Sequence, residues 1–148
     1  MHEITTQLVG LADYNKVRRI DGFERISREY PIYLTDESKL SPEPFDHLFF
    51  PADESELAAV LTQMAAGKIN VTVAGARTGL VGGCVPRGGA LISLENFDRL
   101  QSIVYDEFAG EWRIRSQCAV NLRSLNSQLV SKNFPDIERC GDPAALTA

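Results

Sequence analysis

Cysteine is scarce in this sequence. Its three cysteines, Cys84, Cys118 and Cys140, are odd in number, lie far apart and form no CxxC pair. A disulfide framework and a zinc site are therefore not predicted, and we expect no metal ligands. The simplest interpretation is three reduced thiols in a cytoplasmic protein, since free cysteine is commonly just buried.

Long apolar runs and an excess of positive charge are also missing. No run approaches the length of a membrane span, and the N-terminus has no apolar signal-peptide core. The formal net charge is -5, and the densest basic cluster, "KVRR" at residues 16–19, is typical of a solvated face. A nucleic-acid partner is therefore not predicted, because no basic patch stands out to neutralise phosphates.

What remains is the composition of a globular domain. Of the 148 residues, 44% are hydrophobic and 24% are charged, which fits one ordinary domain or a piece of a larger one. Residues 1–32 carry scattered helical periodicity and predict an N-terminal helical extension. "YPIYLTDESKLSPEPFDH" contains three prolines and predicts a surface connection in which Asp36 and Ser38 cap a turn. His47 has no partner motif and is interpreted as structural.

A strand–helix–strand order begins at residue 47. "HLFFP" predicts a short strand, and "ADESELAAVLTQMAAG" predicts a helix with Asp53 as its cap, Glu56 in a capping box and Gly67 at its end. One apolar stripe at helical spacing marks the buried face of that helix: Leu57, Val60, Leu61 and Met64. "INVTVAG" and "ALISL" predict two further strands. We expect the first two strands to form a parallel pair with a right-handed crossover.

The pattern changes after residue 99. "LQSIVYDEFAGEWRIRSQ" predicts two strands about a turn at Ala109–Gly110, with Trp112 and Ile114 on one face. "NLRSLNSQLVSKN" predicts a second helix, for which Asn121 is the expected cap. The apolar side of this helix is expected to consist of Leu122, Leu125 and Leu129. The tail "FPDIERCGDPAALTA" is typical of a loop.

The stretch "VTVAGARTGLVGGCVPRGGALISLE" concentrates glycine between two strand-like runs. Glycine costs backbone entropy, so the cluster indicates that something approaches this backbone closely. Neither GxxxxGK[ST] nor GxGxxG is present, and "LVGGCVPRGG" has four glycines and a proline within ten residues, which excludes a helix. The segment predicts either a nest of backbone N–H groups that binds phosphate or a tight connection without a ligand. The glycines of such a nest would be Gly75, Gly79, Gly82 and Gly83.

At these residues the sequence resembles a known family. "VTVAGARTGLVGGCVP" followed by "GGALISLENFDRL" resembles the first FAD-binding loop of the p-cresol methylhydroxylase and vanillyl-alcohol oxidase type of flavoprotein. The closest branch is that of D-lactate dehydrogenase and the glycolate oxidase subunit. Four more segments match that branch in order and spacing: "YLTDESKL", "HLFFPADESELAAVL", "RSQCAVNLRSLNSQL" and "CGDPAALTA".

The resemblance implies an α+β fold. Residues 33–148 would be part of a PCMH-type FAD-binding domain, with the first βαβ subdomain complete and the second truncated before its flavin loop. FAD would be held non-covalently, because Thr78 stands where relatives with covalent FAD have histidine. The commonest family loop has three glycines where this chain has "GAR", so the Arg77 side chain must point away from the phosphates or contact one. The implied cofactor-binding residues are Gly75, Ala76, Arg77, Thr78, Gly79, Leu80, Gly82, Gly83, Pro86, Asp142 and Pro143.

The resemblance also implies a function. The full-length protein would be an FAD-dependent oxidoreductase that oxidises a 2-hydroxy acid such as D-lactate or glycolate and reduces an unknown electron acceptor. No catalytic residue is expected in this chain, because the family's second loop and cap domain would follow Ala148. The alternative is a truncated, inactive FAD-domain remnant or an interaction module. A cytoplasmic location is expected, while peripheral membrane association and oligomeric state are left open.

Overall fold

A computed structural model describes residues 12–106 and 108–131 of the chain. The chain divides into two compact units, Met1–Asn96 and Phe97–Ala148. The elements of unit 1 are η1 (Tyr14–Lys16), β1 (Arg19–Asp21), α1 (Phe23–Glu29), η2 (Pro31–Tyr33), β2 (His47–Phe49), α2 (Glu54–Ala66), β3 (Val71–Ala74) and β4 (Ala90–Ser93). The elements of unit 2 are β5 (Leu100–Asp106), β6 (Glu111–Ser116) and α3 (Leu122–Val130).

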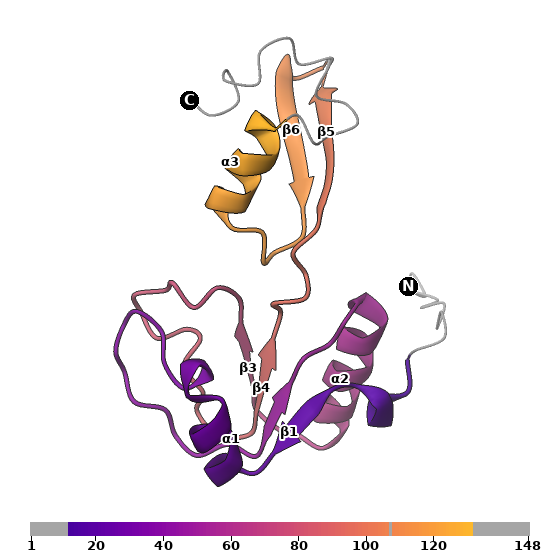
Figure 1. Cartoon of the computed structure of the whole chain (residues 1–148). Coiled ribbons are helices and arrows are strands. Elements are labelled where there is room, and N and C mark those ends of the chain that lie inside the picture. The colour runs from indigo at the N-terminus through magenta and orange to yellow at the C-terminus, as the bar shows by residue number, and fades with distance from the viewer. Residues whose placement is uncertain (1–11, 107, 132–148) are drawn as a thin grey trace, which may run out of the picture. The chain divides into compact units, whose positions relative to one another are not determined.

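Unit 1 is built on a four-stranded sheet in the order β1–β2–β4–β3 (Figure 1). β4 pairs in parallel with β2 and with β3, and β1 pairs antiparallel with β2. β2 and β3 therefore run in the same direction, as predicted, but the expectation that they form a pair is wrong, since β4 lies between them. Every residue of β4 is buried. This continuous apolar run takes an inner position because both faces of the sheet are covered there.

The N-terminal segment contributes a strand that the sequence patterns did not predict. Ile20 of β1 lies opposite Leu48 of β2 and is buried, while Arg19 and Asp21 on either side are exposed. Three residues are too few for alternation to stand out in a charged segment, so this strand depends on its pairing with β2. The domain boundary at residue 32 stays a prediction.

The N-terminus of α2 forms as predicted. The Asp53 carboxylate accepts a hydrogen bond from the backbone N–H of Glu56 at 2.9 Å. The Glu56 carboxylate in turn accepts one from the backbone N–H of Ala52 at 2.8 Å. The reciprocal bond of the capping box therefore reaches one residue further back than in its usual form, and two donors at the helix start are satisfied.

The apolar stripe and the end of α2 differ in detail from the prediction. Val60 and Met64 are buried, but Leu61 is 41% exposed, so the buried face is narrower than expected. Gly67 follows the last turn with a right-handed conformation, at φ −79°. The left-handed residue is Lys68, at φ 52°. The chain therefore reverses one residue later than the glycine indicated.

Two hydrophobic clusters cover the two faces of this sheet. Because side chains alternate along a strand, Leu48 and Phe49 belong to different clusters, as do Leu91 and Ile92. The first cluster includes α1 and η2, and the second includes α2, which places these helices on opposite faces (Figure 1). Buried residues of the first cluster are Ile20, Ile26, Tyr33, Phe45, Leu48, Phe50, Ala74 and Leu91. Those of the second are Val17, Phe49, Val60, Met64, Ala90 and Ile92.

Unit 2 consists of the predicted hairpin and helix. β5 and β6 pair antiparallel, and Gly110 in the turn between them has φ 66°, a left-handed conformation that suits glycine. Asn121 caps α3, because its side chain accepts a hydrogen bond from the backbone N–H of Ser124 at 2.8 Å. These local predictions are confirmed because each depends on residues close together in the sequence.

The core of unit 2 is smaller than the sequence indicated. Among residues 97–106 and 108–131, the hydrophobic cluster has Ile103 and Leu129 as its buried members, with Trp112 packed against them. Leu122 is 82% exposed and Ile114 is 36% exposed, so these two predicted apolar faces are partly wrong. Helical side chains point toward the N-terminus of their helix. Leu122 is the first residue of α3, so its side chain points beyond the helix start and stays exposed.

Candidate functional site

The glycine-rich segment forms the connection from β3 to β4. Residues 75–89 contain turns and bends but no helix, as predicted. β2, β3 and β4 run in the same direction, so their carboxyl ends lie at one edge of the sheet, and the loop leaves β3 at that edge. Open sheets with parallel strands bind ligands outside these carboxyl ends. The loop therefore stands where a ligand site is expected.

Two glycines of the loop are required by the chain itself. Gly82 has φ 75°, and a Cβ built there would lie 2.5 Å from Cδ1 of Leu40. Gly89 has φ 70°, and its Cβ would lie 2.2 Å from the backbone oxygen of Asn70. Both positions combine a left-handed backbone with a close neighbour, so no ligand is needed to explain them.

At Gly75 and Gly83, neither the backbone conformation nor a neighbouring atom requires a glycine. A Cβ at either position would meet no atom within 4 Å, and neither residue has a positive φ. An alanine would therefore fit both the backbone and the space around it. The missing side chains leave open space beside the backbone of the loop, and backbone amides beside such a space are the donors that a phosphate-binding nest offers. The loop therefore fits the pyrophosphate of a dinucleotide, which would occupy space that a Cβ would fill.

A short turn at residues 36–40 packs against the inner side of the loop. Asp36 is 3% exposed, and its Oδ1 accepts hydrogen bonds from the backbone N–H of Ser38 at 2.9 Å and from the Ser38 hydroxyl. The predicted turn cap is therefore confirmed. The Ser38 hydroxyl, followed by backbone amides, holds the pKa of Asp36 below its usual range against the effect of burial.

This turn touches the loop at two of its glycines. Oδ2 of Asp36 has no hydrogen-bond partner and would lie 3.7 Å from a Cβ at Gly79. The Leu40 side chain fills the space beside Gly82. The turn thus supports the loop from the protein side and leaves the opposite side to a ligand.

The other predicted cofactor-binding residues fall into two groups. Ala76, Thr78 and Leu80 are exposed, and Leu80 is 76% exposed. Pro86 is buried, and its carbonyl accepts a hydrogen bond from the backbone N–H of Glu43 at 3.0 Å. Pro86 therefore holds the loop to the chain that precedes β2. Two further predicted residues lie outside the described residues: Asp142 and Pro143.

Arg77 has a different environment from the residues around it in the loop. It has a left-handed backbone, at φ 56°. Its guanidinium carbon lies 4.5 Å from the centre of the Tyr33 ring, a cation–π contact. Nη1 of Arg77 is buried and has no hydrogen-bond partner. The side chain therefore packs against an aromatic ring of unit 1.

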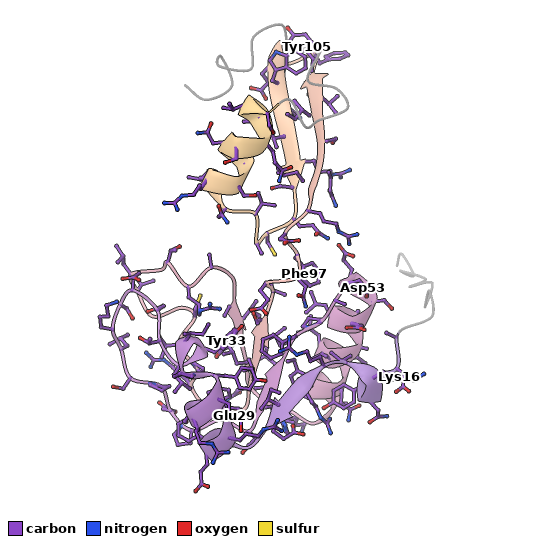
Figure 2. All side chains as sticks on the ribbon, viewed as in Figure 1. Lys16, Glu29, Tyr33, Asp53, Phe97 and Tyr105 are labelled. Carbon is purple, nitrogen blue, oxygen red and sulfur yellow. The ribbon has the colours of Figure 1, made fainter. Side chains whose placement is uncertain are left out.

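Tyr33 and Glu95 are residues of the site that sequence reasoning missed. Tyr33, labelled in Figure 2, is buried, and its hydroxyl donates a hydrogen bond to the carboxylate of Glu95. The Ser93 hydroxyl donates to the same oxygen at 3.2 Å. Burial first, and then Glu95, raise the pKa of Tyr33 to about 12, so the phenol keeps its proton at neutral pH. No motif marks a lone tyrosine or an acid after a strand, and only the fold joins them.

Two other residues that the sequence singles out, His47 and Trp112, contact residues of their own units. Nδ1 of His47 lies 2.7 Å from the carboxylate of Asp21, at the amino end of β2, in agreement with the structural interpretation of His47. Trp112 packs against Tyr105, with ring centres 5.0 Å apart. Within residues 12–106 and 108–131, no group of three His, Cys, Asp or Glu side chains could hold a metal ion. No helix in these ranges is long and apolar enough to cross a membrane.

Comparison with known proteins gives one family and two similar structures. Residues 45–142 match the family model described as FAD binding domain. CrmK, a flavoenzyme involved in the shunt product recycling mechanism in caerulomycin biosynthesis, matches 78% of this chain with 12% identity and a TM-score of 0.54. A variant of BBE-like 1 from Physcomitrella patens matches 64% with 15% identity and a TM-score of 0.45. No curated protein matches.

The match to CrmK shows a shared fold. It shows nothing beyond the fold, because only 12% of the aligned residues are identical. The chain spans about a fifth of the length of each solved protein, at 22% and 20%. The family match covers β2, α2, β3, the glycine loop and β4. It therefore includes every element that forms the candidate site, apart from the segment with Tyr33 and the turn at residues 36–40.

Proposed function

This chain belongs to the family of FAD-binding domains, with FAD as its cofactor, and we propose that it serves an oxidoreductase that oxidises a 2-hydroxy acid. The observation that carries the cofactor site is the open space beside Gly75 and Gly83 in the loop that leaves β3 at the carboxyl edge of the sheet. The substrate class, with D-lactate or glycolate as examples, rests on the resemblance to the D-lactate dehydrogenase and glycolate oxidase branch. Nothing in residues 12–106 and 108–131 favours the alternative of an inactive remnant.

The proposed role of the loop is to bind and orient the cofactor. Backbone N–H groups of residues 75–83 would donate to the two phosphates, and such charge-assisted bonds need no basic side chain. Arg77, the basic residue of this segment, is already packed against Tyr33. When bound, the flavin supplies the redox chemistry, while the protein provides position and orientation. We assign no catalytic residue to this chain.

A comparison of FAD with riboflavin tests the cofactor site. Riboflavin carries the same ring system but neither phosphate nor adenosine, so it should bind the chain far more weakly than FAD in a fluorescence titration. ADP, which carries the pyrophosphate without the flavin, should compete with FAD. Equal binding of riboflavin and FAD, or no binding of FAD, would contradict the proposal.

The substrate class needs a separate test. A protein that carries this chain together with a substrate domain should lose its visible flavin absorbance when mixed anaerobically with D-lactate or glycolate. L-lactate is the matched control for stereochemistry, and dithionite shows that the flavin can be reduced. If dithionite bleaches the flavin and none of a panel of 2-hydroxy acids does, the substrate proposal is wrong and the FAD site is unaffected.

Attachment of the cofactor gives a prediction of its own. Because Thr78 offers no imidazole for a covalent flavin bond at this loop, FAD should be released when the FAD-loaded protein is precipitated with acid. The measurement is flavin absorbance in the supernatant and in the washed pellet. Yellow colour that stays with the pellet would show a covalent bond and contradict the prediction.

A further inference from the structure

Three segments that are distant in sequence meet around one tyrosine. Arg77 follows β3, Tyr33 ends η2 and Glu95 follows β4. The Arg77 guanidinium lies over the Tyr33 ring at 4.5 Å, and the Tyr33 hydroxyl donates to Glu95. We propose that these residues form a clamp that fixes the start of the glycine loop in its cofactor-binding shape. Arg77 is then a positioning residue, and the inference rests on the proposed FAD site.

The backbone of Arg77 has a conformation that suits glycine. At φ 56° the residue is left-handed, a conformation that costs free energy for every residue except glycine. A glycine would avoid this cost and would leave a loop of "GAG" in place of "GAR". The contacts of the Arg77 side chain therefore act at a position where the backbone conformation by itself favours glycine.

The Tyr33 ring, which the Arg77 side chain contacts, is itself held in place by neighbouring residues. Tyr33 is 6% exposed and meets Phe50 edge to face, with ring centres 5.3 Å apart and planes at 86°. Its hydroxyl is held by Glu95, which also accepts a bond from Ser93. A hydrogen bond to a carboxylate increases the electron density of the phenol ring and thereby its attraction for the guanidinium above it. The ring is thus a rigid and electron-rich surface for Arg77.

Burial distinguishes positioning from direct phosphate binding. Nη1 of Arg77 is buried and has no hydrogen-bond partner. Its N–H groups therefore point toward protein atoms and not toward the side of the loop where the ligand would bind. Residues next to Arg77 in the loop, Ala76 and Thr78, are exposed. The arginine therefore holds the chain between them from the protein side, and the amides around it are left free to meet the cofactor.

The chain offers a matched control for the backbone effect. Lys68 has almost the same left-handed backbone, at φ 52°, but is exposed and contacts no ring. Arg77→Gly and Lys68→Gly therefore relieve the same kind of backbone cost, and only the first removes the clamp. We expect Arg77→Gly to weaken FAD binding on the order of tenfold, the size of a partly desolvated cation–π contact, and Lys68→Gly to leave it unchanged. Equal affinity in the two variants would overturn the clamp.

A double-mutant cycle tests whether Arg77 acts through Tyr33. Tyr33→Phe keeps the ring and should keep most of the FAD affinity, whereas Tyr33→Leu removes the ring. In the Tyr33→Leu background, Arg77→Gly should cause little further loss, because the two residues form one interaction. If Arg77→Gly loses its full tenfold in that background too, the arginine contacts the cofactor directly and the clamp is refuted.

A measurement without cofactor separates the clamp from the proposed function. Amide hydrogen exchange of residues 75–83 in the cofactor-free chain should be faster in Arg77→Gly than in wild type and in Lys68→Gly, because the loop has lost its support. Unchanged exchange would overturn the clamp even if FAD binds. A wild-type chain that binds no FAD would overturn the proposed function, while the exchange rates would still decide the clamp.

Discussion

At the scale of single residues, the glycines of the loop have two different causes. Gly82 and Gly89 are left-handed and have neighbours that exclude a Cβ, so the folded chain needs them. Gly75 and Gly83 have neither feature, and the ligand is the remaining reason for a bare backbone. Substitutions at these two pairs should therefore affect different properties, folding for the first pair and cofactor binding for the second.

Valine at Gly83 tests the ligand-facing pair. Gly83→Val should weaken FAD binding by about 2 to 4 kcal/mol, through steric displacement and lost charge-assisted hydrogen bonds. The thermal midpoint of the cofactor-free chain should change little, because no atom lies within 4 Å of the new Cβ. Gly75→Val should behave in the same way. Affinity is measured by flavin fluorescence and stability by thermal unfolding.

Two controls frame this experiment. Gly82→Ala should lower stability, since its backbone has φ 75°, a left-handed conformation that strains a residue with a side chain. Gly110→Ala, in the hairpin turn of unit 2, should cost some stability at φ 66° and barely change FAD affinity. Equal FAD affinity of Gly83→Val and wild type would remove the phosphate-nest interpretation.

Asp36 gives a residue-scale prediction about pH. Its pKa is lower in the folded chain than in the unfolded chain, chiefly because of the Ser38 hydroxyl. The stability that this difference contributes is fully present above the unfolded pKa of about 4 and is lost as pH falls through the lower folded pKa. Asp36→Asn should therefore be less stable than wild type at neutral pH, and the gap should close in acid. Urea unfolding across this pH range measures the gap, and a gap independent of pH would contradict the assignment.

At the scale of elements, helix α2 is held both by its capped N-terminus and by its buried face, where Val60 and Met64 join the core. Asp53 and Glu56 satisfy backbone donors at the helix start, whereas Leu61 of the predicted stripe is exposed. The helix links β2 to β3 and covers one face of the sheet. Its capping therefore contributes to the stability of the scaffold that carries the loop, without contact to the loop itself.

The cap provides an element-scale prediction. Asp53→Ala should lower the free energy of unfolding by about 1 kcal/mol, the usual cost of losing an N-cap side chain. FAD affinity should stay the same, because the Asp53 side chain bonds within its own helix start, to the backbone N–H of Glu56, and to no residue of the loop. Asn121→Ala removes the matching cap of α3 in unit 2 and is the control for a cap outside unit 1. A loss of FAD affinity in Asp53→Ala would show that α2 shifts the loop.

At the scale of the whole molecule, the described residues of the two units differ in the size of their buried clusters. Unit 1 has two clusters of buried side chains on the faces of its sheet. Unit 2 has one cluster whose buried members are Ile103 and Leu129. An isolated two-stranded hairpin is marginal in water, and a helix packed on it adds limited burial. The two units should therefore differ in stability.

Hydrogen exchange checks this difference. Backbone amides of β5, β6 and α3 should exchange faster than those of β2 and β4 under the same conditions, because fewer buried contacts oppose their opening. Leu129→Ala should accelerate exchange in unit 2 further and leave unit 1 unchanged. Equal protection of the two units, or a single transition for both after Leu129→Ala, would show that they unfold together.

The sequence by itself determined the local features of this protein. The glycine loop between two strands, the Asp53 and Asn121 caps, the turn before Gly110 and the buried run of β4 all depend on residues within a few positions of one another. Backbone conformation and capping are short-range effects, so a pattern of neighbours is enough to predict them. The loop alone left a phosphate nest and a connection without a ligand as alternatives, and FAD was implied by the family resemblance.

Only the tertiary structure decided which segments meet. β4 lies between β2 and β3, β1 joins the sheet from the N-terminal segment, and Tyr33 links Arg77 to Glu95. It also separated Gly82, which Leu40 excludes from carrying a side chain, from glycines that face open space. Strand order and side-chain partners depend on burial shared by distant segments, and this long-range packing leaves no pattern in the neighbouring sequence.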